Sequence, residues 1–413
     1  MPDFRFNTDT LTLLARHLFV LKQNSHVTPK RLFVYPTGLC DDKCRYCVDG
    51  LNAGDAAFLR YDPEKDFFNS QAYIDKLISD IKELQIIDMH IFGGGEPFFY
   101  KENMFYFLEK LKDLDIFIRI ITNANRLNDE DIEKIIKNKL VSQLNISFNT
   151  DSDASAAKIY KNTIRHTHTL NILSSITKYK NIYKTDFPKV HIMFVILNIN
   201  YNKVIEIVEL LNEHTIEFFM FQPLRVSADG QRELALSLAQ EEQLIMDIPH
   251  IEEALQRHNM RSNINSLKPT SGISADRDAA ENRPLTNGMT PELSNAKSIN
   301  TKFYKPDFCS FELINKYGLR IKCHMPLTTM AICYNGNIPF CQFKYNEQYR
   351  ANYFDIASLK DFTESQEYRT FVGNFINGEF PEMCRGCSFC IPQETETIKN
   401  IFNGFFRKKD GDL

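Results

Sequence analysis

Three cysteines near the amino terminus are the residues best suited to chemistry. Successive thiols are separated by three and then two residues, in the segment Cys40-Asp41-Asp42-Lys43-Cys44-Arg45-Tyr46-Cys47. A tight loop with this spacing can aim three thiolates at three irons of an iron–sulfur cubane. The fourth iron then has no protein ligand and can bind the amino and carboxylate groups of a small molecule. A structural metal site instead fills its coordination shell with protein ligands.

Two other interpretations of these thiols are a zinc knuckle and unrelated buried cysteines. Zinc would require a fourth Cys or His nearby, and none stands within the loop. A second motif, Gly94-Gly95-Glu96-Pro97, follows about fifty residues later. Glycines let the backbone approach a ligand closely, and the Glu96 carboxylate can pair with an ammonium group. Taken alone, this segment is an ordinary tight turn.

Strands and helices alternate around these two motifs from about residue 31. Between the strands, apolar residues recur at helical spacing, as at Ile74, Leu77, Ile78 and Ile81. Six strand–helix units predict an α/β protein with a parallel sheet, curved or closed, whose site lies at the carboxyl ends of the strands. The predicted strands are residues 31–35, 89–92, 116–121, 141–148, 190–197 and 216–221.

The placement of the two motifs resembles the radical S-adenosylmethionine (SAM) superfamily. The cysteine motif follows the first strand and has an aromatic residue, Tyr46, before its last thiol. Gly94-Gly95-Glu96-Pro97 ends the second strand and is similar to the family's GGEP motif, which binds the methionyl amino group of SAM. The resemblance covers roughly residues 31–226. It implies a partial (β/α)6 TIM-like barrel and a SAM-binding [4Fe–4S] cluster on Cys40, Cys44 and Cys47.

Further polar residues stand where the family contacts SAM. Asn123 follows the third strand, and Ser147 and Asn149 end the fourth. Many members carry Asp at the position of Asn149, so we assign it no proton-transfer role and leave the catalytic residues unassigned. Asn200 and Gln222 follow the last two strands. The complete set of candidates for SAM binding is Tyr46, Gly94, Gly95, Glu96, Pro97, Asn123, Ser147, Asn149, Asn200 and Gln222.

Seven further cysteines lie between residues 309 and 390, after a long stretch with none. Cys323, Gly336 and Cys341 have the spacing C-x12-G-x4-C, which resembles the entry motif of SPASM and twitch domains that hold auxiliary iron–sulfur clusters. A turn at residues 334–337 predicts that Cys341 lies on the return strand of a hairpin. The last run, C-x2-C-x2-C at residues 384–390, is shorter than in a full SPASM domain and favours the twitch type.

One auxiliary [4Fe–4S] cluster therefore follows from the resemblance. The expected ligands are Cys323, Cys341, Cys384 and Cys387, with Cys390 as the leading substitute. Cys309 and Cys333 are either small buried side chains or ligands of a second auxiliary cluster. A four-thiolate structural zinc site is the alternative, and the spacing alone does not separate it from iron–sulfur.

Composition divides the chain into four segments. Residues 259–302 contain no aromatic residue and are rich in Asn, Ser, Pro and Thr, so they predict a flexible linker or lid. The remaining segments are an entry helix at 1–30, the core barrel at 31–258 and a small auxiliary-cluster domain at 303–413. The net charge of −4 provides no basic field to recruit nucleic acid. The sequence has no signal peptide and no apolar run long enough for a membrane helix, so we expect a cytoplasmic protein.

The resemblance also implies a reaction. Reductive cleavage of SAM, with electrons from a donor such as flavodoxin or ferredoxin, yields a 5′-deoxyadenosyl radical that removes hydrogen from an unactivated C–H bond. The auxiliary cluster would assist oxidation or bond formation. A peptide or protein side chain, as for a maturase-type oxidoreductase, is the favoured substrate.

Two alternatives to this substrate and function stay open. Peptide-modifying members often carry an N-terminal leader-binding domain, and only about 30 residues precede the first strand here. Dehydrogenation or epimerisation of a carbohydrate-like or aminocyclitol-like small molecule is therefore one alternative. The other is an iron–sulfur electron carrier or scaffold, which would not need a GGEP motif.

Overall fold

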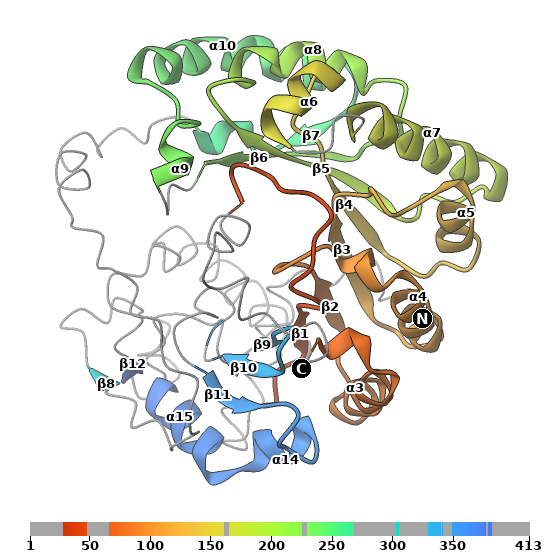
Figure 1. Cartoon of the computed structure of the whole chain (residues 1–413), viewed down its shortest axis with the longest axis vertical. Coiled ribbons are helices and arrows are strands. Elements are labelled where there is room, and N and C mark those ends of the chain that lie inside the picture. Colours follow the sequence, from red (N-terminus) through yellow and green to blue (C-terminus); the bar gives the residue numbers. More distant parts are fainter. Residues whose placement is uncertain are drawn as a thin grey trace, which may run out of the picture.

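An eight-stranded parallel sheet forms the centre of the molecule. The computed structural model describes residues 28–47, 66–160, 165–224, 229–267, 303–304, 329–339, 341, 349–376 and 379–381. The strand order is β7-β6-β5-β4-β3-β2-β1-β9, and every neighbouring pair is parallel. Within these residues the sheet is curved and open, with β7 and β9 at its two edges (Figure 1).

All six strands predicted from the sequence are present. Their ends differ from the predicted ends by no more than two residues. The strands are β1 (Arg31–Val34), β2 (Asp88–Ile91), β3 (Phe117–Thr122), β4 (Gln143–Ser147), β5 (Lys189–Ile196) and β6 (Phe218–Pro223). The partial-barrel fold is therefore confirmed, and the amino-to-carboxyl direction of all six strands is the same.

Helices cover the outer face of the curved sheet (Figure 1). They bury the alternate strand residues that point outward, such as Ile118 and Ile120, in one large apolar core. The longer helices on this face are α3 (Gln71–Leu84), α4 (Lys101–Leu111), α5 (Asp129–Lys137), α7 (Arg165–Tyr183), α8 (Val204–Leu210) and α10 (Leu238–Arg257). Short elements at the loops are η4 (Phe67–Asn69), η5 (Pro97–Tyr100), α6 (Asp153–Ile159), η6 (Tyr201–Lys203) and α9 (Asp229–Arg232).

The barrel extends beyond the carboxyl-terminal boundary that was predicted for it at residue 258. Strand β7 (Arg261–Ser262) pairs with β6, and η7 (Ile264–Leu267) follows it. Met260 and Ile264 are buried against the apolar core. Residues 261–267 thus belong to the barrel and not to the linker predicted at 259–302. Because residues 259–302 are mostly polar, a prediction from their overall composition missed the apolar side chains of Met260 and Ile264. Residues 268–302, like the entry helix predicted before residue 28, lie outside the described residues.

A strand from the carboxyl-terminal part joins the barrel sheet, which the sequence did not predict. Strand β9 (Thr329–Ile332) pairs in parallel with β1, with Leu32 opposite Met330. Its four residues are all buried. A four-residue segment such as this one gives no local indication of its partner, because pairing depends on the free edge of β1. The predicted auxiliary domain therefore contributes strand β9 to the barrel sheet.

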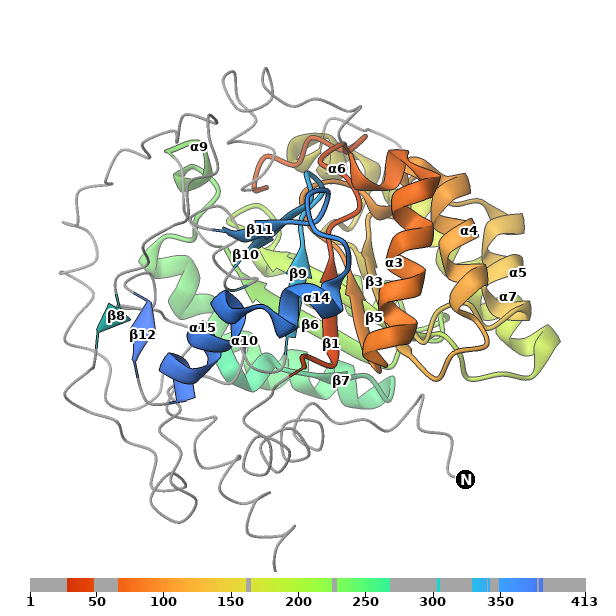
Figure 2. The same cartoon turned by 90° about the horizontal axis from the view of Figure 1, so that it is seen from below.

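In the rest of the described carboxyl-terminal part, residues 337–339 pack beside β9 and residues 359–364 pack beside α3 (Figures 1 and 2). The side chain of Asp80 on α3 accepts hydrogen bonds from Tyr353 Oη at 2.5 Å and from the Leu359 backbone at 3.1 Å. These contacts attach the carboxyl-terminal part to the barrel. Its elements are the pair β10 (Asn337–Pro339) and β11 (Tyr349–Asn352), the pair β8 (Phe303–Tyr304) and β12 (Phe380–Pro381), and helices α14 (Leu359–Glu364) and α15 (Gln366–Ile376).

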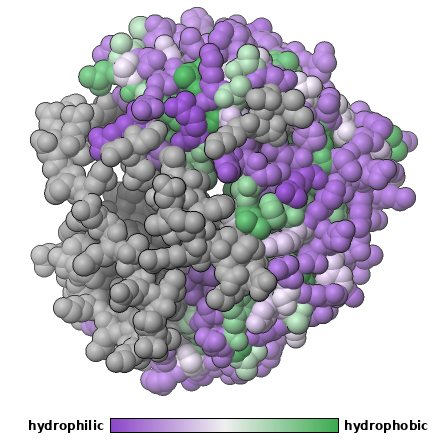
Figure 3. Space-filling view, viewed as in Figure 1, coloured by the Kyte–Doolittle hydropathy of each residue, from purple (hydrophilic) through white to green (hydrophobic). Residues whose placement is uncertain are grey.

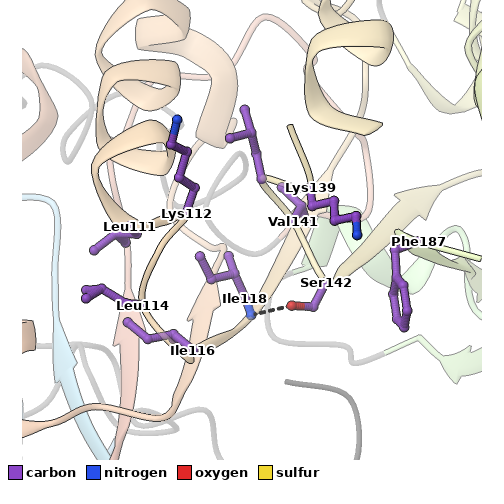
Figure 4. Close-up of a pocket in the computed structure, with 10 residues that line it drawn as sticks. Leu111, Lys112, Leu114, Ile116, Ile118, Lys139, Val141, Ser142 and Phe187 are labelled. Atoms are coloured by element: carbon purple, nitrogen blue, oxygen red, sulfur yellow. Dashed lines mark hydrogen bonds between the residues drawn. The ribbon is translucent and has the colours of Figure 1, made fainter. Parts of the chain in front are cut away.

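The described surface provides no membrane-spanning element. Among the helices that the structure describes, none is both long and apolar enough to cross a bilayer. The face in Figure 3 is largely hydrophilic over these helices. A small pocket lies between the loops that precede β3, β4 and β5, lined by side chains such as Ile116, Ser142 and Phe187 (Figure 4). It is at the amino ends of the strands, opposite the edge where the sequence motifs stand.

Candidate functional site

The three cysteines lie on the loop that leaves the carboxyl end of β1. Cys40, Cys44 and Cys47 are half-buried. The backbone N–H of Asp42 donates to Cys40 Sγ at 3.4 Å, and the N–H of Cys47 donates to the Cys44 carbonyl at 3.1 Å. The loop is therefore compact and carries all three thiols at the carboxyl edge of the sheet, as the sequence predicted.

The glycine-rich turn after β2 packs directly on the cysteine loop. Gly94 has φ +69°, in the left-handed region that favours glycine. A side chain at Gly95 would be impossible here, because a Cβ would lie 1.9 Å from the Leu39 carbonyl oxygen. The N–H of Glu96 donates to that same oxygen at 2.8 Å. The two motifs thus meet one residue before Cys40.

Glu96 carries a fully buried carboxylate that ties β2 to β3. Oε1 accepts from the Phe98 backbone at 3.1 Å and from Thr122 Oγ1 at 2.5 Å, and Oε2 accepts from the Asn123 backbone at 2.8 Å. Burial raises the pKa of Glu96 to about 7, although these hydrogen bonds oppose the rise. Each carboxylate oxygen accepts about two hydrogen bonds, so Oε2 keeps one acceptor position for a ligand.

Asn123 connects this carboxylate to the cysteine loop. Its backbone binds Glu96, while its side-chain Nδ2 lies 3.0 Å from Asp41 Oδ1 and 3.7 Å from Cys40 Sγ. Ala124 follows with φ +64°, which turns the chain sharply after β3. The sequence predicts that Asn123 contacts SAM. In the structure its side-chain amide lies beside Cys40 Sγ.

A buried arginine lies on the other side of the loop, and the sequence did not identify it. Arg165, the first residue of α7, is 2% exposed and forms an ion pair with Asp42. Its Nη1 lies 3.8 Å from Cys44 Sγ, and its guanidinium stacks 3.7 Å from the centre of the Tyr160 ring. No local motif marks Arg165, because 121 residues separate it from Cys44.

Tyr46 and Asn149 join the cysteine loop to the ends of β4 and β5. Asn149 Nδ2 donates to Tyr46 Oη at 2.8 Å and to Tyr160 Oη at 2.7 Å, and its Oδ1 accepts from the Val195 backbone at 2.6 Å. Asn200 Nδ2 donates to the Asn149 and Val195 carbonyls, both at 3.0 Å. The side-chain amides of Asn149 and Asn200 hold the loop in place. The Nδ2 group of each already donates to two described partners.

Ser147 and Gln222, the other two candidates, lie on the strands beneath these loops. Ser147 ends β4 and Gln222 stands in β6. Both side chains are half-buried and stand opposite residues of β5, Met193 and Val195 respectively. They are therefore placed at the carboxyl half of the sheet, whereas Gly94, Gly95, Glu96, Asn123 and Tyr46 contact the cysteine loop or its partners.

The environment of the thiols suits iron–sulfur ligation. Burial raises the pKa of Cys44 to about 12, and the positive charge of Arg165 offsets part of that rise. Burial also raises the pKa of Cys40, which the Asp42 N–H lowers. Donors therefore already point at two of the three sulfurs and would stabilise them as thiolates. Within the described residues, no group of three or more His, Cys, Asp or Glu side chains is placed to hold a single metal ion. An iron–sulfur cubane does not require such a group, because each thiolate binds a different iron.

Part of the second cysteine group is also described. The predicted turn is present, with Gly336 at φ +80° and its N–H donating to the Cys333 carbonyl at 2.9 Å. Cys333 is buried directly after β9, and Cys341 is half-buried shortly after β10, a strand that pairs with β11 and not with β9. Cys309, Cys323, Cys384, Cys387 and Cys390 lie outside the described residues, so their predicted ligand roles stay predictions.

The fold and loop together define a class of α/β protein: an open parallel barrel with a three-thiol loop at its carboxyl edge. Residues 34–211 match the family model of the radical SAM superfamily. Over these residues the chain is therefore similar to a radical SAM superfamily domain. The matched range lies within the region in which the sequence resembled this family. No curated protein matches the chain.

Solved structures of similar fold include two proteins that were solved with S-adenosylmethionine. Streptococcus suis SuiB bound to S-adenosylmethionine is 21% identical, with a TM-score of 0.53 over 86% of this chain and 71% of SuiB. SuiB has also been solved with its precursor peptide SuiA, at 19% identity and TM-score 0.53 over 86% of this chain and 69% of SuiB. The protein anSMEcpe, solved with AdoMet and a peptide called Cp18Cys, is 15% identical, with a TM-score of 0.51 over 87% of each chain. These likenesses confirm the barrel fold.

Proposed function

We propose that this protein cleaves SAM reductively at a [4Fe–4S] cluster held by Cys40, Cys44 and Cys47, and removes hydrogen from a C–H bond of a peptide or protein side chain. The observation that carries the proposal is the direct contact between the cysteine loop and the Gly94–Glu96 turn, through the Leu39 carbonyl. Bound together, the cluster and SAM supply one-electron cleavage of the sulfonium to methionine and a 5′-deoxyadenosyl radical.

The protein side chains would bind and orient SAM at this edge. The remaining acceptor position on Glu96 Oε2 is suited to the methionyl ammonium, and the backbone of the glycine turn allows the amino-acid end to approach closely. Asn123 and Arg165 would stabilise the thiolates of Cys40 and Cys44 by donating towards their sulfurs. Tyr46 and Asn149 would keep the loop rigid, since both are fixed by hydrogen bonds to the barrel.

A peptide substrate is supported by the kinds of protein that share the fold. SuiB and anSMEcpe have both been solved with peptides, and no comparable observation in the described residues favours a sugar-like metabolite. We therefore keep a maturase-type oxidoreductase as the proposal. Electrons would come from an external donor such as flavodoxin or ferredoxin.

An auxiliary [4Fe–4S] cluster on Cys323, Cys341, Cys384 and Cys387 is part of the same proposal. Its support is the position of the turn after β9: the Tyr334 ring would lie 3.1 Å from a Cβ at Gly94, so this turn adjoins the proposed SAM-binding turn. A cluster near Cys341 would therefore lie on the same side of the sheet as the first cluster. Iron analysis after anaerobic reconstitution tests it, with about eight irons expected because each cubane holds four.

The decisive experiment is product analysis with dithionite as reductant in the absence of oxygen. The reconstituted protein should form 5′-deoxyadenosine and methionine slowly even without substrate. With the true substrate, deuterium at the reacting carbon should appear in 5′-deoxyadenosine. S-adenosylhomocysteine as the main product, with no 5′-deoxyadenosine, would overturn the proposal.

A further inference from the structure

The turn after β2 is a stretch of backbone that has no side chains of its own. Residues 93–95 are all glycine, and glycine loses more conformational freedom on folding than any other residue. Two of the three have positive φ, +81° at Gly93 and +69° at Gly94. The conformation of this glycine turn (residues 93–95) therefore depends on the groups that pack against it.

Two different parts of the chain pack against the glycine turn. The first is the segment 35–39, which leaves β1 and would overlap a Cβ placed at Gly93 or Gly95. The second is the carboxyl-terminal part, because a Cβ placed at Gly94 would lie 3.1 Å from the Tyr334 ring. The ring thus lies against the backbone of the middle glycine, although 240 residues separate the two in the sequence.

The backbone around Tyr334 is fixed beside the glycine turn. The Tyr334 carbonyl accepts a hydrogen bond from the Phe67 N–H at 2.8 Å. Two further backbone hydrogen bonds, both of 2.9 Å, close the turn that carries it: the Cys333 N–H donates to the Asn337 carbonyl, and the Gly336 N–H donates to the Cys333 carbonyl. The half-buried Tyr334 ring therefore projects from a well-defined backbone.

A series of contacts continues from this turn to helix α3. The Gly336 carbonyl accepts from the Tyr353 N–H at 2.6 Å, and Tyr353 Oη donates to Asp80 at 2.5 Å. Lys76 Nζ donates to the Tyr353 carbonyl at 2.8 Å and lies 4.1 Å from the centre of the same ring. Helix α3 thus holds Tyr353, and Tyr353 holds the turn that carries Tyr334. The contact with the glycine turn is the end of the series that attaches the carboxyl-terminal part to the barrel.

We propose that Tyr334 is a positioning residue for SAM binding: its ring holds the glycine turn in the conformation that receives the amino-acid end of SAM. This inference rests on the proposed function and adds a role for the carboxyl-terminal part that requires no auxiliary cluster. Tyr334 acts through the turn, so SAM affinity depends on how the carboxyl-terminal part packs on the barrel. Without the ring, SAM binding must order the turn again, and the lost conformational entropy weakens binding.

Equilibrium dialysis of SAM against the full-length reconstituted protein tests this role. Tyr334→Ala should weaken SAM binding about 5- to 30-fold, the equilibrium factor for ordering one backbone residue. Tyr334→Phe keeps the ring and should bind SAM as the wild type does. Tyr183→Ala is the matched control, because it removes a half-buried ring from the last residue of α7 and should leave SAM affinity unchanged. Iron content is measured on each variant, so that loss of the cluster is not counted as weaker SAM binding.

Amide hydrogen exchange without SAM measures the glycine turn itself. In Tyr334→Ala, the amides of residues 93–96 should exchange faster than in the wild type, whereas Tyr334→Phe should show no change. Asp80→Ala removes the contact between α3 and Tyr353 and should also weaken SAM binding. In the Tyr334→Ala background it should weaken SAM binding little further, because the two substitutions act through the same ring.

The outcomes separate this inference from the proposed function. Wild-type SAM affinity in Tyr334→Ala would overturn the positioning role and leave the proposed function in place. Equal weakening in Tyr334→Ala and Tyr334→Phe would also contradict it, as would faster exchange throughout the barrel helices, which indicates a general loss of stability. If the wild-type protein binds no SAM while exchange at residues 93–96 is faster in Tyr334→Ala, the proposed SAM site is wrong and the ring only packs on the turn.

Discussion

The cysteine loop is held by two different kinds of contact on its two sides. Towards β2 and β3 it meets Glu96 and Asn123, where backbone N–H groups and amides provide neutral donors around one buried acid. Towards β4 and α7 it meets Arg165, a buried full charge 3.8 Å from Cys44 Sγ. Cys40 and Cys44 therefore lie in unequal electrostatic surroundings.

This difference indicates that one side of the loop binds a ligand and the other side supports the loop. The Glu96 side is built on two adjoining turns and leaves an acceptor position for a bound molecule. The Arg165 side is closed: its guanidinium is shared among Asp42, the Tyr160 ring and the Ser147 carbonyl at 3.0 Å. We infer that the first side determines SAM affinity and the second side determines the stability of the loop and the charge at Cys44.

The largest effect tests whether the two sides serve one cluster. Substituting Cys40, Cys44 and Cys47 together with alanine should abolish 5′-deoxyadenosine formation, because no thiolate remains to bind the irons. Iron content should fall by about four per chain and not to zero, since a cubane holds four irons and the proposed auxiliary cluster would use other cysteines. Loss of all iron would show that the two cysteine groups are not independent.

The next effect tests the closed side. Arg165→Met should lower the free energy of unfolding of the metal-free protein by about 3–5 kcal/mol, because it leaves Asp42 buried without its partner. Adding Asp42→Asn should restore part of this loss. Arg45 also lies on the cysteine loop and forms an exposed ion pair with Glu233. Arg45→Gln should lower the free energy of unfolding by only about 0–1 kcal/mol. Equal effects of the two arginine substitutions in denaturant titrations would contradict the distinction.

A third effect tests the ligand-binding side. Glu96→Gln should weaken SAM binding roughly 10- to 150-fold, since a hydrogen bond to a charged group contributes about 1.5–3 kcal/mol. Equilibrium dialysis on the reconstituted protein measures it. Unchanged affinity would show that Glu96 only joins the turn to β3.

The raised pKa of Glu96 adds a pH dependence to this test. Because its folded pKa is about 7, above the usual value, the carboxylate that pairs with an ammonium forms only as pH rises through 7. SAM affinity should therefore increase between pH 6 and 7.5 in the wild type and stay flat in Glu96→Gln. In the ligand-free protein the linkage has the opposite sign: the stability that Glu96 contributes at low pH is lost as pH rises through about 7.

The smallest effect uses one substitution at two places. Gly95→Ala forces a Cβ into the Leu39 carbonyl and should cost about 1–3 kcal/mol of stability, as overpacking does, with weaker iron retention. Gly373→Ala, in the middle of α15 with nothing within 4 Å of the new Cβ, should stabilise the protein by about 0.5–1 kcal/mol. Thermal unfolding of both variants gives the comparison. A neutral result at Gly95 would mean that the loop moves freely relative to the turn.

Much of the barrel could be predicted because its information is local. Alternating strand and helix periodicities placed all six core strands, and the cysteine and glycine motifs each occupy one short loop. Parallel strands bring their carboxyl ends to one edge, so the meeting of Cys40 with Glu96 followed from strand order alone. The same holds for Asn123, whose place after β3 brought it to Cys40.

Only the tertiary structure revealed the residues that act across long sequence distances. Arg165 lies against Cys44 because α7 begins beside the loop, and nothing in its own segment distinguishes it from a surface arginine. Strand β9 joins β1 because that edge of the sheet is free to pair, and the four residues of β9 alone do not indicate this partner. Arg119, Gln143 and His191 form one cluster because neighbouring strands are in a particular register. Local motifs are written in adjacent residues, whereas ion pairs and buried polar clusters depend on which faces the packed strands and helices turn towards each other.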